Sequence, residues 1–307
     1  MAYLDIVFHN IRRNMVIVGA GQAYYNGFPA AANVGQGAGG AFVVPGPSAA
    51  WGASVTGAAT AAGIFLCEAP AYGSFFANWD VPPLNILGNL GMVPATDRRC
   101  LYLRGGAPAG PVAVLPAVPM QIGAAAWFGR GLLGAPDHGI RCLGTGAVNF
   151  PPLPVPSAPP GSDRFALLFQ ADWNYNGSAQ RVTGLFVHTK NTQADPGTQI
   201  VALCRLFPNE IIFGDMNLNL REVYKNTSLS YAVGGTHTIL ALRQVGGGGN
   251  YYHTRYAGGG GTSTIDYALV PNAQVANVEL WARCPGPVPV LQQNGSDHSV
   301  MMLRIRV

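Results

Sequence analysis

Charge is the scarcest property of this 307-residue sequence. Asp, Glu, Lys and Arg together make up 10% of the chain, against about 25% in an ordinary soluble domain. Hydrophobic residues make up 49%. This composition excludes an intrinsically disordered chain, because disorder requires low hydrophobicity together with high net charge. Only 14 residues are acidic, so each Asp or Glu beside a predicted strand is a candidate site residue.

Lysine is almost absent as well. Of the 18 basic residues, only Lys190 and Lys225 are lysines, which leaves 16 arginines. The planar guanidinium of arginine suits bidentate contacts with phosphate. The formal net charge is only +4, so the sequence indicates a mild preference for anionic partners. A compositional bias of the source genome explains the shortage of lysine equally well.

Several familiar signals are missing. No C-x-x-C occurs, which argues against a structural zinc site, and an odd number of cysteines leaves at least one thiol free. No uncharged apolar run is long enough to span a membrane, and the N-terminus has no basic segment followed by an apolar one. The chain is therefore expected to be cytoplasmic, to have had a leader removed, or to be exported by another route. The cysteines are Cys67, Cys100, Cys142, Cys204 and Cys284.

Short apolar runs bounded by turn residues predict a fold rich in strands. Asp195 followed by Pro196 is typical of a helix start, so strand 182–188, a helix ending before Pro208 and strand 210–214 form a predicted βαβ unit. An Ala-rich stretch predicts a second helix over 48–62. The predicted strands are 3–9, 63–67, 99–103, 111–117, 165–171, 182–188, 210–214, 264–270, 276–282 and 299–306.

Three stretches rich in glycine or proline are expected to be loop insertions: residues 19–47, 150–162 and 246–261. None of them separates two obvious cores, and no repeat of fixed period is present. We therefore expect one domain over residues 1–307. The pattern Gly35-x-Gly37-x-x-Gly40 fits a dinucleotide loop literally, but no strand leads into it, and no Walker A sequence occurs.

Polar residues recur where predicted strands end, which is where α/β folds place their sites. Each one alone is more often a turn or cap residue. Asp266 is the exception, because a charge within an apolar strand needs a partner, and a histidine is the natural one. In chain order the motifs are His9-Asn10, Glu68, His188, Gly214-Asp215-Met216-Asn217, Asp266-Tyr267 and Ser296-Asp297-His298.

Taken in this order, the motifs resemble those of the endonuclease/exonuclease/phosphatase superfamily. The start, Phe8-His-Asn-Ile-Arg12, is similar to the first strand of the deoxyribonuclease I family. The stretch Thr264-Ile-Asp-Tyr-Ala-Leu-Val270 is closer to the catalytic B subunit of cytolethal distending toxins. The resemblance implies an α/β fold: a two-layer β-sandwich flanked by helices, here with Gly- and Pro-rich loop insertions.

The resemblance also implies a role for each motif residue in metal-assisted hydrolysis of phosphate esters. Mg²⁺, for which Mn²⁺ can substitute, would be held by Glu68 with Asn10 and Asp297. The catalytic group would be an Asp266–His298 pair, with Asp215 and Asn217 positioning water or a phosphate oxygen and His188 donating to the phosphate. Substrate contacts would come from Arg164, Arg12 and Asn10.

The sequence departs from the family pattern at three places. Met216 replaces the usual Phe or Leu, and Ser299-Val300 follow His298 where an aromatic or other residue and then proline are usual. The glutamate that deoxyribonuclease I pairs with its first catalytic histidine is replaced by Arg98 and Arg99. This last change leaves His188 without its usual partner, and favours either the toxin-like branch or a weakened site.

Three functions remain open at this point. The first is a Mg²⁺-dependent endonuclease acting on double-stranded DNA, as a secreted bacterial genotoxin or effector with delivery subunits. The second is a phosphatase acting on phosphoinositides or another phosphomonoester, and the third is a catalytically weakened binding module. Residues 218–220 lack the Tyr-Arg typical of the inositol phosphatases, and Lys190 is the only lysine near a motif. Both observations favour the nuclease.

Overall fold

The structure is a computed structural model of the chain. Within it, the described residues are 3–10, 33–36, 42–43, 61–69, 100–103, 123–128, 138–142, 152–153, 164–175, 178–189, 196–226, 230, 233–241, 253–256, 262–283, 298–299 and 301–306.

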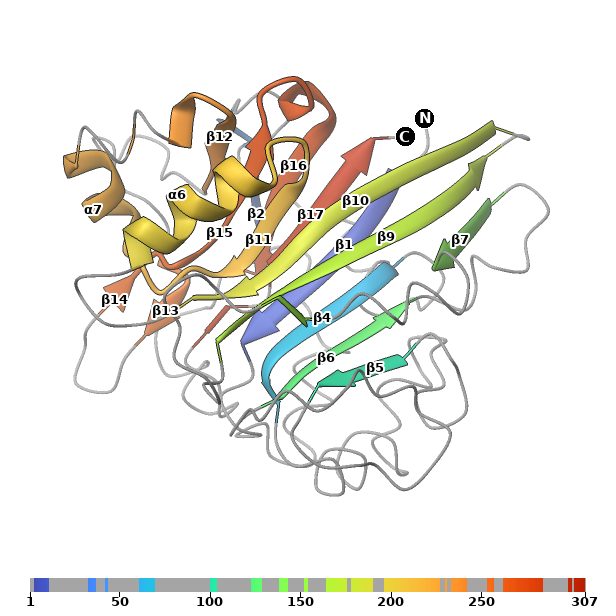
Figure 1. Cartoon of the computed structure of the whole chain (residues 1–307), viewed down its shortest axis with the longest axis horizontal. Helices are drawn as coiled ribbons and strands as arrows, with labels where there is room; N and C mark the ends of the chain where they lie inside the picture. The colour runs from blue at the N-terminus through green and yellow to red at the C-terminus, as the bar shows by residue number, and fades with distance from the viewer. Residues whose placement is uncertain are drawn as a thin grey trace.

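Two large β-sheets form the body of the described structure (Figure 1). One has eight strands in the order β3-β2-β16-β17-β1-β4-β6-β5, and the other follows the order β12-β15-β11-β10-β9-β7 with β8 paired to β9. The elements are β1 (Tyr3–Asn10), β2 (Asn33–Gln36), β3 (Phe42–Val43), β4 (Ala61–Ala69), β5 (Cys100–Leu103), β6 (Gly123–Phe128), β7 (His138–Cys142), β8 (Pro152–Leu153), β9 (Phe165–Tyr175), β10 (Ser178–His188), α6 (Pro196–Leu206), β11 (Ile211–Asp215), α7 (Leu220–Lys225), β12 (His237–Leu240), β13 (Arg255–Tyr256), β14 (Thr262–Ser263), β15 (Asp266–Pro271), the 3₁₀ helix η4 (Val275–Asn277), β16 (Val278–Arg283) and β17 (Met301–Arg306).

Each sheet contains one parallel pair of strands that matters for the site. In the eight-stranded sheet, β1 runs parallel to β4 and antiparallel to β17. In the other sheet, β10 runs parallel to β11, and α6 connects the two. The βαβ unit predicted from the sequence is thus confirmed. Within each pair the carboxyl ends of both strands lie at the same edge of the sheet.

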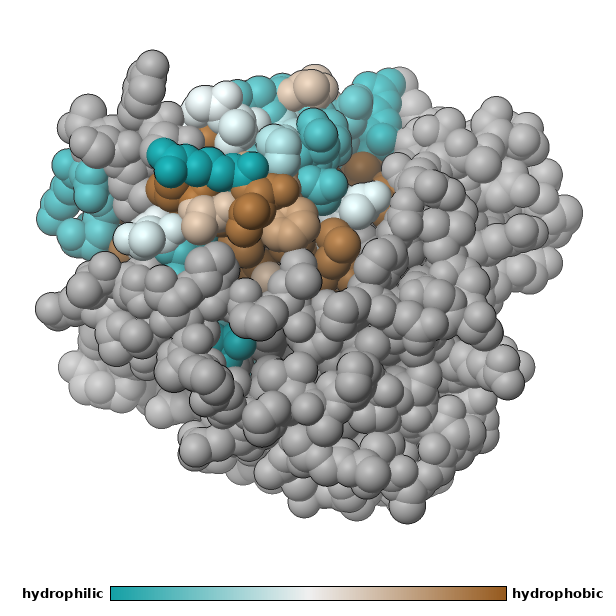
Figure 2. All heavy atoms as spheres, viewed as in Figure 1, coloured by the Kyte–Doolittle hydropathy of each residue, from teal (hydrophilic) through white to brown (hydrophobic). Residues whose placement is uncertain are grey.

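Helix α6 covers the outer face of the β10–β11 sheet (Figure 1). Its residues Ile200 and Leu203 are fully buried and pack with Leu185 and Val187 of β10 in one apolar cluster. Because side chains alternate along a strand, Phe186, which lies between Leu185 and Val187, points to the opposite face of the sheet. Figure 2 shows hydrophobic residues gathered on the described surface in this view, with hydrophilic residues around them.

That opposite face packs against the eight-stranded sheet through four buried phenylalanines. Ring centroids are 5.2 Å apart for Phe8–Phe213, 5.4 Å for Phe65–Phe186 and for Phe65–Phe213, and 5.7 Å for Phe186–Phe213. These tilted and edge-on contacts are the favourable arrangements for aromatic rings. Two of the rings come from each sheet, so the sheets form the two-layer sandwich that the sequence analysis predicted.

Most of the predicted elements are found, with shifted ends. The predicted helix over 48–62 is wrong at its end, because residues 61–62 begin β4, in which Ala61 pairs with Asp5 of β1. The rest of that helix lies outside the described residues, as does the predicted strand 111–117. The three expected insertions also carry short strands, namely β2, β3, β8 and β13. No helix among the described residues is long and apolar enough to cross a membrane.

Candidate active site

Four of the polar motif residues lie directly beyond the phenylalanine cluster, at the carboxyl ends of the same strands. In three strands the polar residue follows the phenylalanine by two positions, and residues two apart on a strand share a face. The alternation that points the rings between the sheets therefore points the next inward side chain into a common polar cluster. The pairs are Phe8 with Asn10 in β1, Phe186 with His188 in β10, and Phe213 with Asp215 in β11.

Glu68 joins the same cluster through an irregularity in its strand, β4. It stands three positions after Phe65 in β4, so strict alternation would point it to the opposite face. The pairing of β4 with β6 shifts register between Leu66 and Ala69, and Glu68 has a φ of 53°. This irregularity is a β-bulge, which adds one residue to a strand and re-aims the side chains that follow. Glu68 consequently faces Asn10 and His188.

Backbone conformation explains the residue types at the first and last positions of the Gly214-Asp215-Met216-Asn217 motif. Gly214 has a φ of 137°, and a Cβ placed on it would lie 2.1 Å from the Val187 carbonyl oxygen of the neighbouring strand. Only glycine fits there without a backbone shift. Asn217 has a φ of 48°, a conformation that Asn tolerates better than most residues. Its amide side chain donates to the Thr189 carbonyl oxygen at 2.9 Å, and its backbone N–H donates to Asp215 Oδ1 at 2.9 Å.

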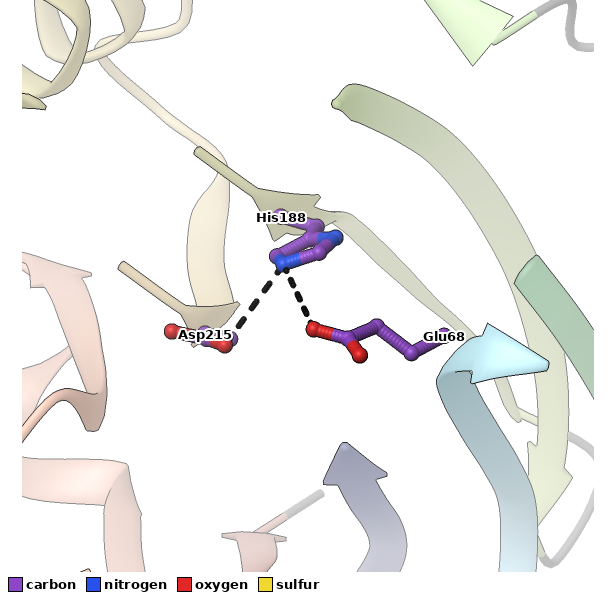
Figure 3. A group of neighbouring side chains, drawn as sticks. All are labelled: Glu68, His188 and Asp215. Atoms are coloured by element: carbon purple, nitrogen blue, oxygen red, sulfur yellow. Dashed lines mark ion pairs between the residues drawn. The ribbon is translucent and has the colours of Figure 1, made fainter. Parts of the chain in front are cut away.

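Two carboxylates form the centre of the cluster. Asn10 Nδ2 donates to Glu68 Oε1 at 3.1 Å and to Asp215 Oδ2 at 2.8 Å. His188 Nε2 lies 3.5 Å from the same Glu68 oxygen and 3.6 Å from the same Asp215 oxygen (Figure 3). Glu68, His188 and Asp215 could together hold a metal ion, since one ligand atom of each lies within 4.8 Å of the others.

Asp266 and His298 form a hydrogen-bonded pair beside this centre. His298 Nδ1 lies 2.9 Å from Asp266 Oδ2 and 3.1 Å from Oδ1, and both residues are buried. A carboxylate that accepts from Nδ1–H fixes the imidazole tautomer and leaves Nε2 to act on the proton of another group. His298 Nε2 points toward the centre, 3.9 Å from Asp215 Oδ2.

Burial changes the chemistry of two groups in the cluster. The pKa of Asp215 is raised, chiefly by burial and further by the negative charge of Asp266, although His298 and the N–H groups of Asn10 and Asn217 act in the other direction. Asp215 therefore attracts a proton more strongly than an exposed aspartate does. Burial, followed by the Asp215 charge, also raises the pKa of Cys67 well above its usual value. Cys67 is therefore excluded as a thiolate nucleophile at neutral pH.

His188 has partners that the sequence analysis did not expect. The replacement of a family glutamate by Arg98 and Arg99 predicted a histidine without its usual neighbour. The structure instead places Glu68 and Asp215 beside His188, and the Arg164 guanidinium contacts the His188 ring. Arg164 thus lies beside His188, and its contact with substrate stays a prediction. Arg12 and Asp297, predicted as a substrate and a metal contact, lie outside the described residues together with Arg98 and Arg99.

Two further residues hold the site together that the sequence analysis did not assign. His9 Nε2 donates to the His298 carbonyl oxygen at 3.0 Å, which ties β1 to the segment before β17. Thr254 binds the backbone of both segments that carry the Asp266–His298 pair. The sequence alone does not predict either role, because each depends on a partner elsewhere in the chain. The partner of His9 lies 289 positions away, and those of the Thr254 hydroxyl lie 11 and 12 positions away.

Comparison with known proteins identifies the fold but not a sequence family. No family model matches the chain, and no curated protein matches it either. The crystal structure of TDP2 from C. elegans matches with a TM-score of 0.50 and 12% identity, covering 99% of this chain and 75% of that one. The endonuclease domain of TRAS1, a telomere-specific non-LTR retrotransposon, matches at 0.48 and 12%, covering 99% of each chain. D. rerio TDP2 complexed with a single-strand DNA product matches at 0.48 and 13%, covering 100% of each.

Proposed function

We propose that this chain, which has the deoxyribonuclease I-like fold, is a metal-dependent phosphodiesterase that cleaves DNA. The observation that carries the proposal is the convergence of six polar side chains from segments spread over nearly the whole sequence. A structural cluster of this kind would be costly to bury without a function, because buried charges require partners and still lose hydration. The six residues are Asn10, Glu68, His188, Asp215, Asp266 and His298.

The donor set fits a hard divalent cation. Glu68 and Asp215 offer carboxylate oxygens close together, held by the Asn10 Nδ2 group, and the oxygen of the same amide is a further possible ligand. Mg²⁺ prefers oxygen ligands and retains several waters, so one or two carboxylates are enough to bind it. We assign the ion to Glu68 and Asn10, with Asp297 as a further ligand. When bound, the ion would supply positive charge against the oxygens of the phosphate.

Side chains of the protein carry out the proton transfer. Asp266 keeps the proton of His298 on Nδ1, so that Nε2 can accept a proton as water attacks phosphorus. A new P–O bond forms to the water oxygen, and the bond to the leaving oxygen breaks; the leaving oxygen takes up a proton from solvent. Asp215 lies on the same side as His298 Nε2 and is the group best placed to orient this water, together with Asn217.

His188 and Arg164 are assigned to the phosphate. They adjoin one another and the two carboxylates, so a phosphate oxygen entering the centre would meet a ring N–H and a guanidinium. Donors that are already held in place stabilise the charge of the transition state without reorganising.

DNA is favoured over a lipid headgroup by the residues that come after the Gly-Asp-x-Asn motif. Asn219 caps α7, its side chain accepting from the Arg221 N–H at 3.2 Å, and Leu220 is fully buried. These positions serve the helix and provide no cation for a phosphomonoester pocket. A nuclease can instead distribute its phosphate contacts along a broad surface, which suits scattered arginines.

The resemblance of residues 264–270 to a toxin subunit supports a finer proposal, that the chain is a genotoxin delivered with partner subunits.

The decisive test places purified protein on supercoiled plasmid with Mg²⁺, beside a phosphate-release assay on phosphoinositide vesicles. We expect relaxed circles that disappear with EDTA, return with Mg²⁺ or Mn²⁺, and weaken strongly in His298→Ala. Phosphate release that depends on His298, with intact plasmid, would transfer the assignment to a phosphatase. Silence in both assays, with a folded wild-type protein, would favour a binding module.

A further inference from the structure

We propose that Thr254 is a positioning residue that holds Asp266 and His298 in register with each other. The proposal rests on the proposed function, because it assigns the role through the pair that performs the proton transfer. Thr254 lies one residue before β13, in a stretch that the sequence analysis treated as a glycine-rich insertion, and it is buried with 1% of its surface exposed.

The Thr254 hydroxyl acts on the Asp266 side of the pair. Its Oγ1 accepts hydrogen bonds from the backbone N–H groups of Ile265 and Asp266, both at 3.0 Å. These are the last residue before β15 and the first residue in it. One oxygen thus satisfies two buried backbone donors at the point where the chain enters the strand, and it fixes the direction in which the Asp266 side chain leaves the backbone. Buried backbone donors of this kind nearly always require a partner.

The Thr254 backbone acts on the His298 side. Its carbonyl oxygen accepts from the Ser299 N–H at 2.7 Å, and its own N–H donates to the Ser263 carbonyl oxygen at 2.9 Å. The next residue, Arg255, pairs with His298 in an isolated antiparallel bridge. A single residue therefore joins the segment of Asp266 to the segment of His298, although the two side chains are 32 positions apart in sequence.

The role requires a hydrogen-bond acceptor at this position and explains the residue type. Serine keeps the oxygen, whereas valine keeps the shape and removes it. Without the acceptor, two buried N–H groups are unsatisfied, and the turn into β15 must shift to reach another partner. A displacement of about 1 Å in a catalytic group lowers turnover by roughly 10²-fold. The residues that we assign to the phosphate, Arg164 directly before β9 and His188 at the end of β10, lie on other segments, so KM should change little.

The test compares Thr254→Val, Thr254→Cys and Thr254→Ser for plasmid nicking with Mg²⁺, at a temperature where circular dichroism shows each variant folded. We expect kcat to fall roughly 10–10²-fold in Thr254→Val with KM within about twofold, an intermediate loss in Thr254→Cys, whose sulfur is a weak acceptor, and recovery in Thr254→Ser. Thr238→Val is the matched control, because the Thr238 hydroxyl donates to Asn272 Oδ1 at 2.8 Å, away from the site. Its kcat should equal that of the wild type.

A second comparison separates positioning from mere loss of structure. In a His298→Ala background, Thr254→Val should cause little further loss, because the group that it positions is gone. If the two substitutions multiply, or if Thr254→Cys and Thr254→Val both keep the wild-type kcat, the proposal is wrong while the nuclease assignment stands. A Thr254→Val variant that does not fold leaves Thr254→Cys and Thr254→Ser to decide the matter. An inactive wild-type protein would instead contradict the proposed function itself.

Discussion

The same four strands carry two layers of opposite chemistry within a few residues of each other. The inner layer is the cluster of four phenylalanines between the sheets. The outer layer is the polar cluster, which begins at the next inward position in β1, β10 and β11 and after a bulge in β4. Both layers use the same geometry, namely strand alternation and two parallel strand pairs. Their energetic roles differ. Burying rings stabilises the fold, whereas burying carboxylates costs free energy that hydrogen bonds only partly offset.

The comparison indicates a division of labour that substitutions can test. If it is correct, changes in the polar layer reduce catalysis more than stability, and changes in the phenylalanine layer do the reverse. Gly214 lies between the layers in the chain and should affect both.

The largest effect is expected from the polar layer at Asp266. Replacing Asp266 with Asn keeps the shape of the side chain but removes the charge that holds the His298 tautomer, 2.9 Å away. We expect plasmid nicking to slow by about 10²–10⁴-fold, the range for lost general acid–base assistance, while the melting temperature changes little. A slow and unstable Asp266→Asn variant would contradict the division between the layers.

Substitutions in the phenylalanine layer should reduce stability more than catalysis. Phe213 contacts three other rings of the cluster and is fully buried. Phe213→Ala is expected to lower the free energy of unfolding by about 3–5 kcal/mol, the usual cost of truncating a buried phenylalanine, as measured by urea denaturation. Phe213→Leu should recover much of this loss. Turnover per folded molecule should fall far less than in Asp266→Asn, and an equal fall would merge the two layers into one.

Gly214→Ala tests the connection between the layers. The added methyl group would meet the Val187 carbonyl oxygen, and the φ of 137° is strained for any residue with a Cβ. We expect a stability loss of at least about 1–3 kcal/mol, accompanied by slower nicking because Asp215 follows directly. Gly234→Ala is the control, since a Cβ there meets nothing within 4 Å. Unchanged stability in Gly214→Ala would show that β10 and β11 can separate at this point.

Asn10→Ala should affect the metal more than the fold. Asn10 Nδ2 holds Glu68 and Asp215 together, and the loss of such a supporting group commonly weakens metal binding about 10–100-fold. We expect the Mg²⁺ concentration for half-maximal nicking to rise by that factor, with activity restored at high Mg²⁺. Glu68→Gln should resist such rescue. A normal Mg²⁺ requirement in Asn10→Ala would remove Asn10 from the metal site.

The smallest effect concerns a buried histidine outside both layers. His237 Nε2 donates to the Glu210 carbonyl oxygen at 3.0 Å, and burial lowers the pKa of His237 below its usual 6.5. As the pH falls through 6.5, the unfolded chain takes up this proton before the folded chain does, so stability should decrease. His237→Gln should lose less stability than the wild type between pH 7.5 and about 5.5, as measured by thermal unfolding. An identical pH dependence of the two proteins would contradict this sign.

Much of the fold and the site could be predicted from the sequence because strand ends carry local signals. Asn10, His188 and Asp215 each follow an apolar run at a spacing that alternation makes meaningful, and Asp195-Pro196 with the flanking strands predicts the βαβ unit. The order of the motifs along the chain predicted the two-layer sandwich and the other candidate site residues. Their catalytic roles remain predictions, as do the single domain and the position of Asp297.

Other features could not be predicted, because they depend on pairing between distant segments. The predicted Ala-rich helix overlaps the start of β4, where Ala61 pairs with Asp5 of β1, because pairing with another strand overrides local helix propensity. The bulge that turns Glu68 inward is visible only in the pairing of β4 with β6. Thr254 sits in a glycine-rich stretch, and its value comes entirely from the Asp266 and His298 segments that it joins.

The His9–His298 contact has a consequence for when the protein becomes active. It links positions 289 apart, and β1 pairs along its length with β17. During synthesis, β1 leaves the ribosome long before β17, so the edge of β1 that β17 covers stays unpaired until residues 301–306 have been made. Folds with such distant pairings form slowly and expose apolar strand edges in the meantime. The centre that we propose cuts DNA therefore cannot assemble until the segments that carry Asp266 and His298 have been made and β17 has paired with β1.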